Sequence, residues 1–215
     1  MNILLLGATG KCGRWVHKLA HQRNHTITAI ARPHSVHKLA APATTIEAET
    51  LTEDLILDAA QNQDVIISTL GLNRASIIPW SKLQSPPDLV QTVMATLMNL
   101  CAEPTPPKII WLSAAGAGPS REHVFPLVRK MTTLGNVGVA YKDLDAAESI
   151  VAPHADQIIT TRPATLTNLN STKPAKPMPR YKLTSTIPRR AVAQWMLDAA
   201  ESDAPASDQP LMIHA

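Results

Sequence analysis

The chain has 215 residues, enough for one domain with a substantial core, and 20 Lys and Arg against 17 Asp and Glu give a formal charge of only +3. This balance, without a recognisable DNA-binding motif, argues against a nucleic-acid-binding protein, and no apolar run approaches membrane-spanning length. An apolar strand begins at the second residue and the two cysteines show no pairing pattern, so we expect a cytoplasmic protein without a signal peptide.

A glycine turn joins the first predicted strand to the first predicted helix. The apolar run 3–6 precedes the motif Gly-Ala-Thr-Gly-Lys-Cys-Gly at 7–13, and helical periodicity follows. In a dinucleotide-binding turn, Gly7 permits the sharp bend, Gly10 lets the backbone approach the pyrophosphate, and Gly13 lets the helix pack closely on the strand. The alternative is a glycine turn without a ligand. The cofactor-binding candidates in the turn are Gly7, Thr9, Gly10, Lys11, Cys12 and Gly13.

The second predicted strand, 26–31, is followed by a basic residue where NAD-binding proteins usually carry an acid. That residue is Arg32, and the stretch 33–39 adds His34, His37 and Lys38 but no Asp or Glu. A guanidinium suits the 2′-phosphate of NADP, so NADP is favoured over NAD. The alternative is a solvated basic loop. The histidines lack ligand spacing and cysteine partners, so no metal site is predicted.

The rest of the chain alternates between predicted strands and helices. Strands are expected at 43–48, 64–68, 108–112, 157–161 and 210–214, and helices at 52–61, 88–102, 121–134, 139–151 and 188–200, with a loop at 71–87. Such alternation predicts a single α/β domain over 1–215, with a Rossmann-type, doubly wound, mainly parallel sheet and helices on both faces.

Two loops are candidates for the walls of a ligand cleft. Residues 157–197 contain no Asp or Glu, and within them the segment 168–181 carries Pro174, Pro177 and Pro179, which disfavour a helix. A basic lid of this kind favours an anionic acceptor, and the alternative is an exposed loop. Trp80, in the loop 73–85, either stacks on a planar ligand or packs as an ordinary aromatic residue.

Several further motifs follow the glycine turn along the chain. They are Ser68-Thr69-Leu70-Gly71, Leu112-Ser113-Ala114-Ala115-Gly116, Glu148 before Thr161-Arg162-Pro163-Ala164-Thr165-Leu166, and Ile187 to Ala193. With these motifs the chain resembles the atypical short-chain dehydrogenase/reductase family, in its NAD(P)H-binding, NmrA-like and biliverdin/flavin-reductase-like branch. The resemblance implies that Thr69, Leu70, Gly71, Ser113, Pro163, Ala164 and Thr165 line the nicotinamide side of the cofactor.

The catalytic apparatus of the wider family is incomplete in this sequence. The resemblance implies a Ser that polarises a carbonyl and a Tyr whose pKa is lowered by a Lys four residues later. Ser113 and Tyr141 are the catalytic candidates, but the lysine position holds Asp145, and Lys142 points about 100° away on a helix. An alternative register, counted back from Glu148, also lacks the pair. Tyr141 is alternatively a core or ribose-contact residue.

The missing Tyr-Lys pair directs the functional expectation away from alcohol–ketone chemistry. Hydride transfer to a flavin or quinone needs no enzymic proton donor, because the protein mainly positions two rings. We therefore expect an NADPH-dependent oxidoreductase acting on a small conjugated acceptor, with a flavin as one possible substrate. The alternative is a non-catalytic NADP-binding redox sensor or assembly factor, and an epimerase or dehydratase is weaker because it needs the absent pair. Oligomeric state is not readable from the sequence.

Overall fold

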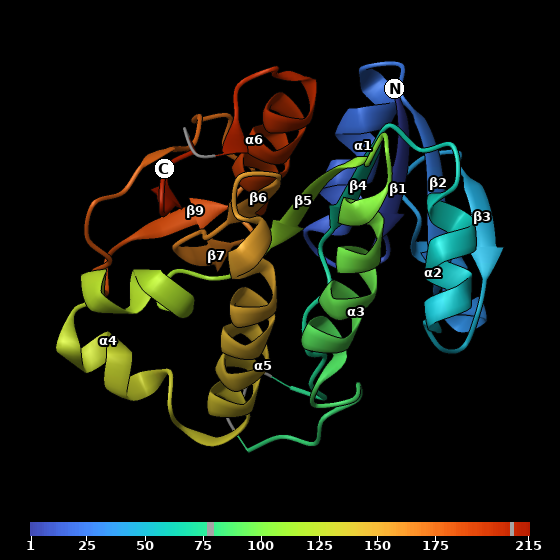
Figure 1. Cartoon of the computed structure of the whole chain (residues 1–215). Helices are drawn as coiled ribbons and strands as arrows, with labels where there is room; N and C mark the ends of the chain where they lie inside the picture. The colour runs from blue at the N-terminus through green and yellow to red at the C-terminus, as the bar shows by residue number, and fades with distance from the viewer. Residues whose placement is uncertain (77–79, 207–208) are drawn as a thin grey trace.

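Six parallel strands form the centre of the molecule, in the order β3-β2-β1-β4-β5-β6 (Figure 1). The computed structural model describes residues 1–76, 80–206 and 209–215, so Pro79 of the predicted loop lies outside the described residues. The strands are β1 (Asn2–Leu6), β2 (Thr26–Ala31), β3 (Thr44–Glu47), β4 (Val65–Ser68), β5 (Lys108–Leu112) and β6 (Ile158–Thr161). They confirm the predicted parallel sheet and lie within the six predicted ranges, apart from Asn2 at the start of β1.

Helices cover both faces of this sheet (Figure 1). On one face lie α1 (Gly13–Gln22) and α6 (Arg189–Glu201); on the other lie α2 (Glu53–Ala60), α3 (Leu89–Met98) and α5 (Gly135–Val151). Alternate residues of β1 serve the two cores: Ile3 and Leu5 join the first, Leu4 and Leu6 the second. All four are fully buried, which explains why this strand is apolar at every position from Ile3 to Leu6.

A smaller group of elements lies beside β6, and we call it the outer lobe. It contains α4 (Pro126–Met131) and four short strands, β7 (Thr165–Thr167), β8 (Lys176–Pro177), β9 (Thr186–Pro188) and β10 (Ile213–His214). The strand β7 pairs in parallel with β9, and β10 pairs antiparallel with β8. The predicted strand 210–214 is therefore wrong in extent: two of its residues are a strand, and their partner is the proline-rich segment rather than the central sheet.

The predicted helix 121–134 is also wrong. A 3-10 helix at Gly118–His123 ends before α4 begins, because Val124 bridges to Tyr181 and the Phe125 N–H donates to the Tyr181 carbonyl at 3.0 Å. The backbone that makes this contact is extended, so the 3-10 helix cannot continue into α4. Helix α4 then begins at Pro126, and the first position of a helix tolerates proline well. Helix α5 begins at Gly135 rather than 139, and α3 gives way to a 3-10 turn at Asn99–Ala102.

A buried carboxyl group joins the two helices that pack most extensively on the second face. Asp143, in α5, accepts hydrogen bonds from the backbone N–H groups of Val90 at 3.0 Å and Gln91 at 2.9 Å, in the first turn of α3. Burial raises the pKa of Asp143 above its usual value, although the two N–H donors oppose this. Asp143 therefore caps α3 from outside that helix and fixes α5 beside it.

No helix in the described ranges combines the length and the apolar composition needed to cross a bilayer. Both cysteines, Cys12 and Cys101, are free.

Candidate functional site

The predicted site residues follow strands that all end at one edge of the sheet. In a parallel sheet the carboxyl ends share an edge, so the turns after β1, β2, β4, β5 and β6 come together there. The strand β1 lies between β2 and β4, which is where the strand order reverses. Open α/β sheets bind their ligands beyond this edge and at this reversal.

The glycine turn after β1 is held in an unusual shape by two neighbours. Gly7 has a φ of +82°, and its carbonyl accepts from the Gly10 N–H at 2.9 Å. The Thr69 hydroxyl contacts the carbonyls of Leu6 at 3.1 Å and Gly7 at 3.2 Å. A Cβ on Gly13 would lie 2.1 Å from the Gly7 carbonyl oxygen, so α1 packs directly against the turn. Thr69, expected beside the nicotinamide, is therefore occupied in bracing the glycine turn.

Backbone donors point out of this turn at the start of α1. Within the described chain, the N–H groups of Lys11, Cys12 and Gly13 form no hydrogen bond, whereas the Arg14 N–H already pairs with the Gly10 carbonyl at 2.9 Å. Free amides at the positive end of a helix suit an anion. The turn therefore fits the pyrophosphate of a dinucleotide.

The thiol of Cys12 has no sign of redox activation. Its residue is 7% exposed, and burial raises the thiol pKa to about 11, against a smaller lowering effect of the Arg189 guanidinium. A thiol with this pKa is protonated at neutral pH and is a poor nucleophile. The structure thus favours Cys12 as a small residue that fits the turn.

Arg32 follows β2 directly and lies one strand away from the glycine turn. The N–H and the hydroxyl of Ser35 both donate to the Arg32 carbonyl, at 2.8 and 3.0 Å, and fix the start of the 3-10 helix Pro33–Lys38. The Arg32 guanidinium has no carboxylate partner among the described residues. It is half-buried and unpaired, as a ligand for a 2′-phosphate should be.

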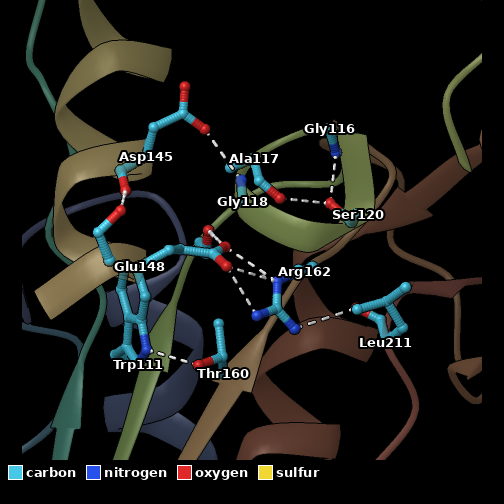
Figure 2. A network of polar contacts seen from close by, with 12 residues as sticks. Trp111, Gly116, Ala117, Gly118, Ser120, Asp145, Glu148, Thr160, Arg162 and Leu211 are labelled. Atoms are coloured by element: carbon cyan, nitrogen blue, oxygen red, sulfur yellow. Dashed lines mark hydrogen bonds and ion pairs between the residues drawn. The ribbon is translucent and has the colours of Figure 1, made fainter. Parts of the chain in front are cut away.

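Ser113, at the end of β5, belongs to a buried polar network. Its hydroxyl donates to Glu148 of α5 at 2.6 Å, and Glu148 accepts three further bonds from Arg162 at 2.7–3.1 Å. Arg162 also reaches the Leu211 carbonyl at 3.4 Å, and Gly118 lies against the carboxylate (Figure 2). A serine has one O–H hydrogen, and that of Ser113 is donated to Glu148. In this arrangement Ser113 has no proton to offer a carbonyl.

Tyr141 is similarly committed. Its hydroxyl donates to the Ala115 carbonyl at 3.0 Å, and its pKa is raised well above the usual value by burial, then by Tyr181 and Asp145, with Arg121 opposing. Asp145, in place of the lysine, accepts from the Gly118 N–H at 2.9 Å (Figure 2). It also pairs with Arg121. The aspartate thus anchors the loop after β5. A proton-donating tyrosine needs a lowered pKa, and this environment does the opposite.

The remaining predicted wall residues differ in accessibility. Leu70 packs against the second core, while a Cβ on Gly71 would meet nothing within 4 Å. Ala164 is 3% exposed and follows Pro163, whereas Thr165 is an exposed residue whose hydroxyl bonds the Tyr181 hydroxyl at 2.7 Å. Thr165 thereby fixes the end of the predicted lid 168–181, whose covering role stays a prediction.

Trp80 is 74% exposed, which contradicts the packed alternative for this residue. Its proposed stacking on a ligand stays a prediction. In the described part of the chain no three His, Cys, Asp or Glu side chains cluster as metal ligands.

Sequence reasoning assigned no role to two residues that organise the site. In the sequence, Glu148 is only part of a motif, and Asp145 marks only a departure from the family pattern. A glutamate inside a helix usually reads as solvent-exposed, and only its partners in space, Ser113 and Arg162, reveal it as buried.

Comparisons with known proteins agree with the fold. Residues 7–203 match the family model described as NAD(P)H-binding. ChuY, an anaerobillin reductase from Escherichia coli O157:H7, is 20% identical, with a TM-score of 0.73 over 100% of this chain and 97% of that one. A candidate NADH-flavin reductase from Streptococcus pneumoniae TIGR4 is 16% identical, with a TM-score of 0.70 over 100% and 99%.

A short-chain dehydrogenase/reductase from Veillonella parvula DSM 2008, solved with NADP, is 14% identical, with a TM-score of 0.70 over 99% and 92% of the two chains. These likenesses show the fold. No curated protein matches the sequence.

Proposed function

Because the chain belongs to the NAD(P)H-binding family of atypical short-chain dehydrogenases/reductases, we propose that it is an NADPH-dependent reductase of a small conjugated acceptor. Bound NADPH supplies the hydride. The acceptor takes up that hydride and one proton from water, and the products are NADP⁺ and the dihydro form of the acceptor. A flavin, a quinone or a linear tetrapyrrole fits this balance.

The chain's own residues divide the work of binding. The glycine turn and its free amides hold the pyrophosphate, and Arg32 holds the 2′-phosphate. Gly71, Ser113 and Thr165 line the nicotinamide side at the ends of β4, β5 and β6. Cofactor and acceptor are then oriented face to face, and orientation is the main contribution a protein makes to hydride transfer between two rings.

The proposal rests on one observation: both candidate proton donors already donate their hydroxyl hydrogens to groups within the protein. The only hydrogen of Ser113 goes to Glu148, and that of Tyr141 goes to the Ala115 carbonyl. A ketone needs a proton at its oxygen as hydride arrives, whereas a conjugated acceptor spreads the charge and takes its proton from solvent. The site therefore favours the second class of acceptor.

The similar proteins and the charge of the outer lobe support the choice of acceptor. Of two proteins of the same fold, one is named as a reductase of anaerobillin and the other as a candidate NADH-flavin reductase. Lys173, Lys176, Arg180 and Lys182 lie in or beside the lid segment, within a stretch that has no acidic residue. A basic surface attracts carboxylates and phosphates, so the proposed acceptor is anionic.

Turnover with a panel of acceptors tests this function. We expect NADPH oxidation, followed at its absorbance, with FMN, a linear tetrapyrrole or a water-soluble quinone, and none with simple ketones. Tyr141→Phe should change kcat by less than about 3-fold, because losing a true proton donor costs about 10² to 10⁴-fold. A larger loss in Tyr141→Phe, with an unchanged unfolding temperature, contradicts the proposed absence of an enzymic proton donor.

Cofactor preference is tested by reversing the charge at Arg32. Arg32→Glu should weaken NADPH binding by about 10-fold to 100-fold, because it removes charge-assisted hydrogen bonds and adds repulsion, and should change NADH binding by less than about 3-fold. Fluorescence titration with both cofactors measures this. Lys38→Glu makes a similar charge reversal at the far end of the 3-10 helix that Arg32 precedes and should leave the NADPH preference intact. If Arg32→Glu weakens the binding of NADPH and of NADH equally, Arg32 is not a ligand of the 2′-phosphate.

A second candidate function rests on the same committed protons. A protein that binds NADP without turnover, as a redox sensor or assembly factor, also needs no proton donor. Tight NADPH binding with no oxidation across the whole acceptor panel favours this alternative.

A further inference from the structure

Helices α1 and α6 run side by side in the same direction, so their positive ends meet beside the glycine turn. At their carboxyl ends, Arg23 of α1 pairs with Asp198 at 2.8 Å and Glu201 at 2.9 Å, both in α6. At their amino ends, Arg189 is the first residue of α6 and lies close enough to Cys12, which precedes α1, to lower the pKa of its thiol against the larger effect of burial. Two helix dipoles and a guanidinium thus share one small region.

The start of α6 carries two positive side chains that do not stabilise the helix. Arg189 and Arg190 open the helix, and its first turn holds no acidic residue. Cations at the positive end of a helix are unfavourable. Such a pair is therefore a cost to the fold unless an anion binds there.

The polar partners of these two arginines are neutral. Arg189 donates to the Asn168 amide oxygen at 2.7 Å, and Arg190 donates to that of Asn170 at 3.3 Å. Arg23, Arg121 and Arg162 instead form ion pairs with carboxylates. Among the described residues no carboxylate neutralises Arg189 or Arg190.

The two arginines differ in what they face. Arg189 lies against Cys12, whose own backbone N–H is one of the free donors of the glycine turn. Arg190 lies over the ring of Trp15, 5.7 Å from its centroid, one turn further along α1. Only Arg189 therefore adjoins the loop that holds the cofactor's phosphates.

We propose that Arg189 is a ligand of the cofactor pyrophosphate, acting from α6 opposite the amides of the glycine turn. The proposal rests on the nucleotide site of the proposed function and not on turnover. Arg189 supplies the full positive charge that the backbone amides lack, and the side chain that binds it, Asn168, begins the lid segment. Phosphate binding and the position of the lid then share one guanidinium.

Three ligands separate this role from that of Arg32. ADP-ribose carries the pyrophosphate without a 2′-phosphate, adenosine 2′-phosphate carries the reverse, and NADPH carries both. By calorimetric titration, Arg189→Gln should weaken NADPH and ADP-ribose by about 10-fold to 100-fold and leave adenosine 2′-phosphate within about 2-fold. Arg32→Gln should show the opposite selectivity. Arg190→Gln is the matched control and should leave all three affinities within about 2-fold.

Unchanged NADPH and ADP-ribose affinity in Arg189→Gln overturns the proposal. An equal loss for all three ligands, or an equal effect of Arg190→Gln, also overturns it, because each reports a general loss of fold or charge. Arg189→Lys, which keeps the charge, should recover part of the affinity. No acceptor enters these titrations, so a failure of reductase turnover leaves their result standing.

Discussion

Glu148→Ala should lower the free energy of unfolding by about 3–5 kcal/mol, a cost typical of breaking a buried ion pair. The Glu148 side chain is 3% exposed and its partner Arg162 only 13%. Alanine leaves the guanidinium buried without a carboxylate and also removes the acceptor of the Ser113 hydroxyl. The Arg162 guanidinium and the Ser113 hydroxyl are then removed from water without a hydrogen bond to replace it, which is unfavourable. Urea-induced unfolding of the two proteins measures the difference.

Glu201→Ala makes the same chemical change at an exposed ion pair. Its side chain is 38% exposed and pairs with Arg23 and His25, so the expected loss is about 0–1 kcal/mol. Replacing both members of the buried pair, in Glu148→Gln with Arg162→Met, should recover part of the stability lost in Glu148→Ala. Equal losses in Glu148→Ala and Glu201→Ala show that burial of the network contributes nothing.

Gly13→Ala should abolish dinucleotide binding and destabilise the protein by about 3 kcal/mol or more. The added Cβ would lie 2.1 Å from the Gly7 carbonyl oxygen and 2.8 Å from the Thr69 hydroxyl. Both neighbours are fixed, since Gly7 is backbone and the Thr69 hydroxyl is bound to the turn. The helix must therefore move away from the strand, and its amides leave the phosphate position. ADP-ribose titration and thermal unfolding measure the two effects.

Gly71→Ala is the steric control for this change. A Cβ at Gly71 meets no atom within 4 Å, and its backbone does not need a positive φ. Stability and ADP-ribose binding should both be unchanged within about 0.5 kcal/mol, since ADP-ribose has no nicotinamide to meet the new methyl group. Normal ADP-ribose binding by Gly13→Ala refutes the close packing of helix on turn.

The central sheet could be predicted because its signals are local. The run Ile3–Leu6 is apolar throughout since both faces of β1 are covered, and a glycine turn follows it. The short strands of the outer lobe carry no such signal. Lys176–Pro177 is a strand because Ile213–His214 pairs with it, and neither segment is long enough to show a period. The predicted helix 121–134 failed for the same reason, since the contact of Val124 with Tyr181 interrupts it.

Only part of the chemistry of the site can be predicted from the sequence. The absence of a lysine after Tyr141 is visible in the sequence, and in the structure burial raises the pKa of Tyr141 rather than lowering it. What replaced the lysine was not visible, because Asp145 binds Gly118 and Arg121 across more than twenty residues. Ser113 presents the same problem, since its residue type suggests a donor to substrate while its hydroxyl donates a hydrogen bond to Glu148.

The pairing of β10 has a consequence for the order in which the protein is completed on the ribosome. All six strands of the central sheet have been synthesised by residue 161. The outer lobe must wait for residues 212–215, because the carbonyls of Met212 and Ile213 accept from the N–H groups of Met178 and Ala164, and the Ala215 N–H donates to the Thr186 carbonyl. A nascent chain therefore has its glycine turn and the whole central sheet long before the outer lobe can form, and the central sheet is completed first during synthesis.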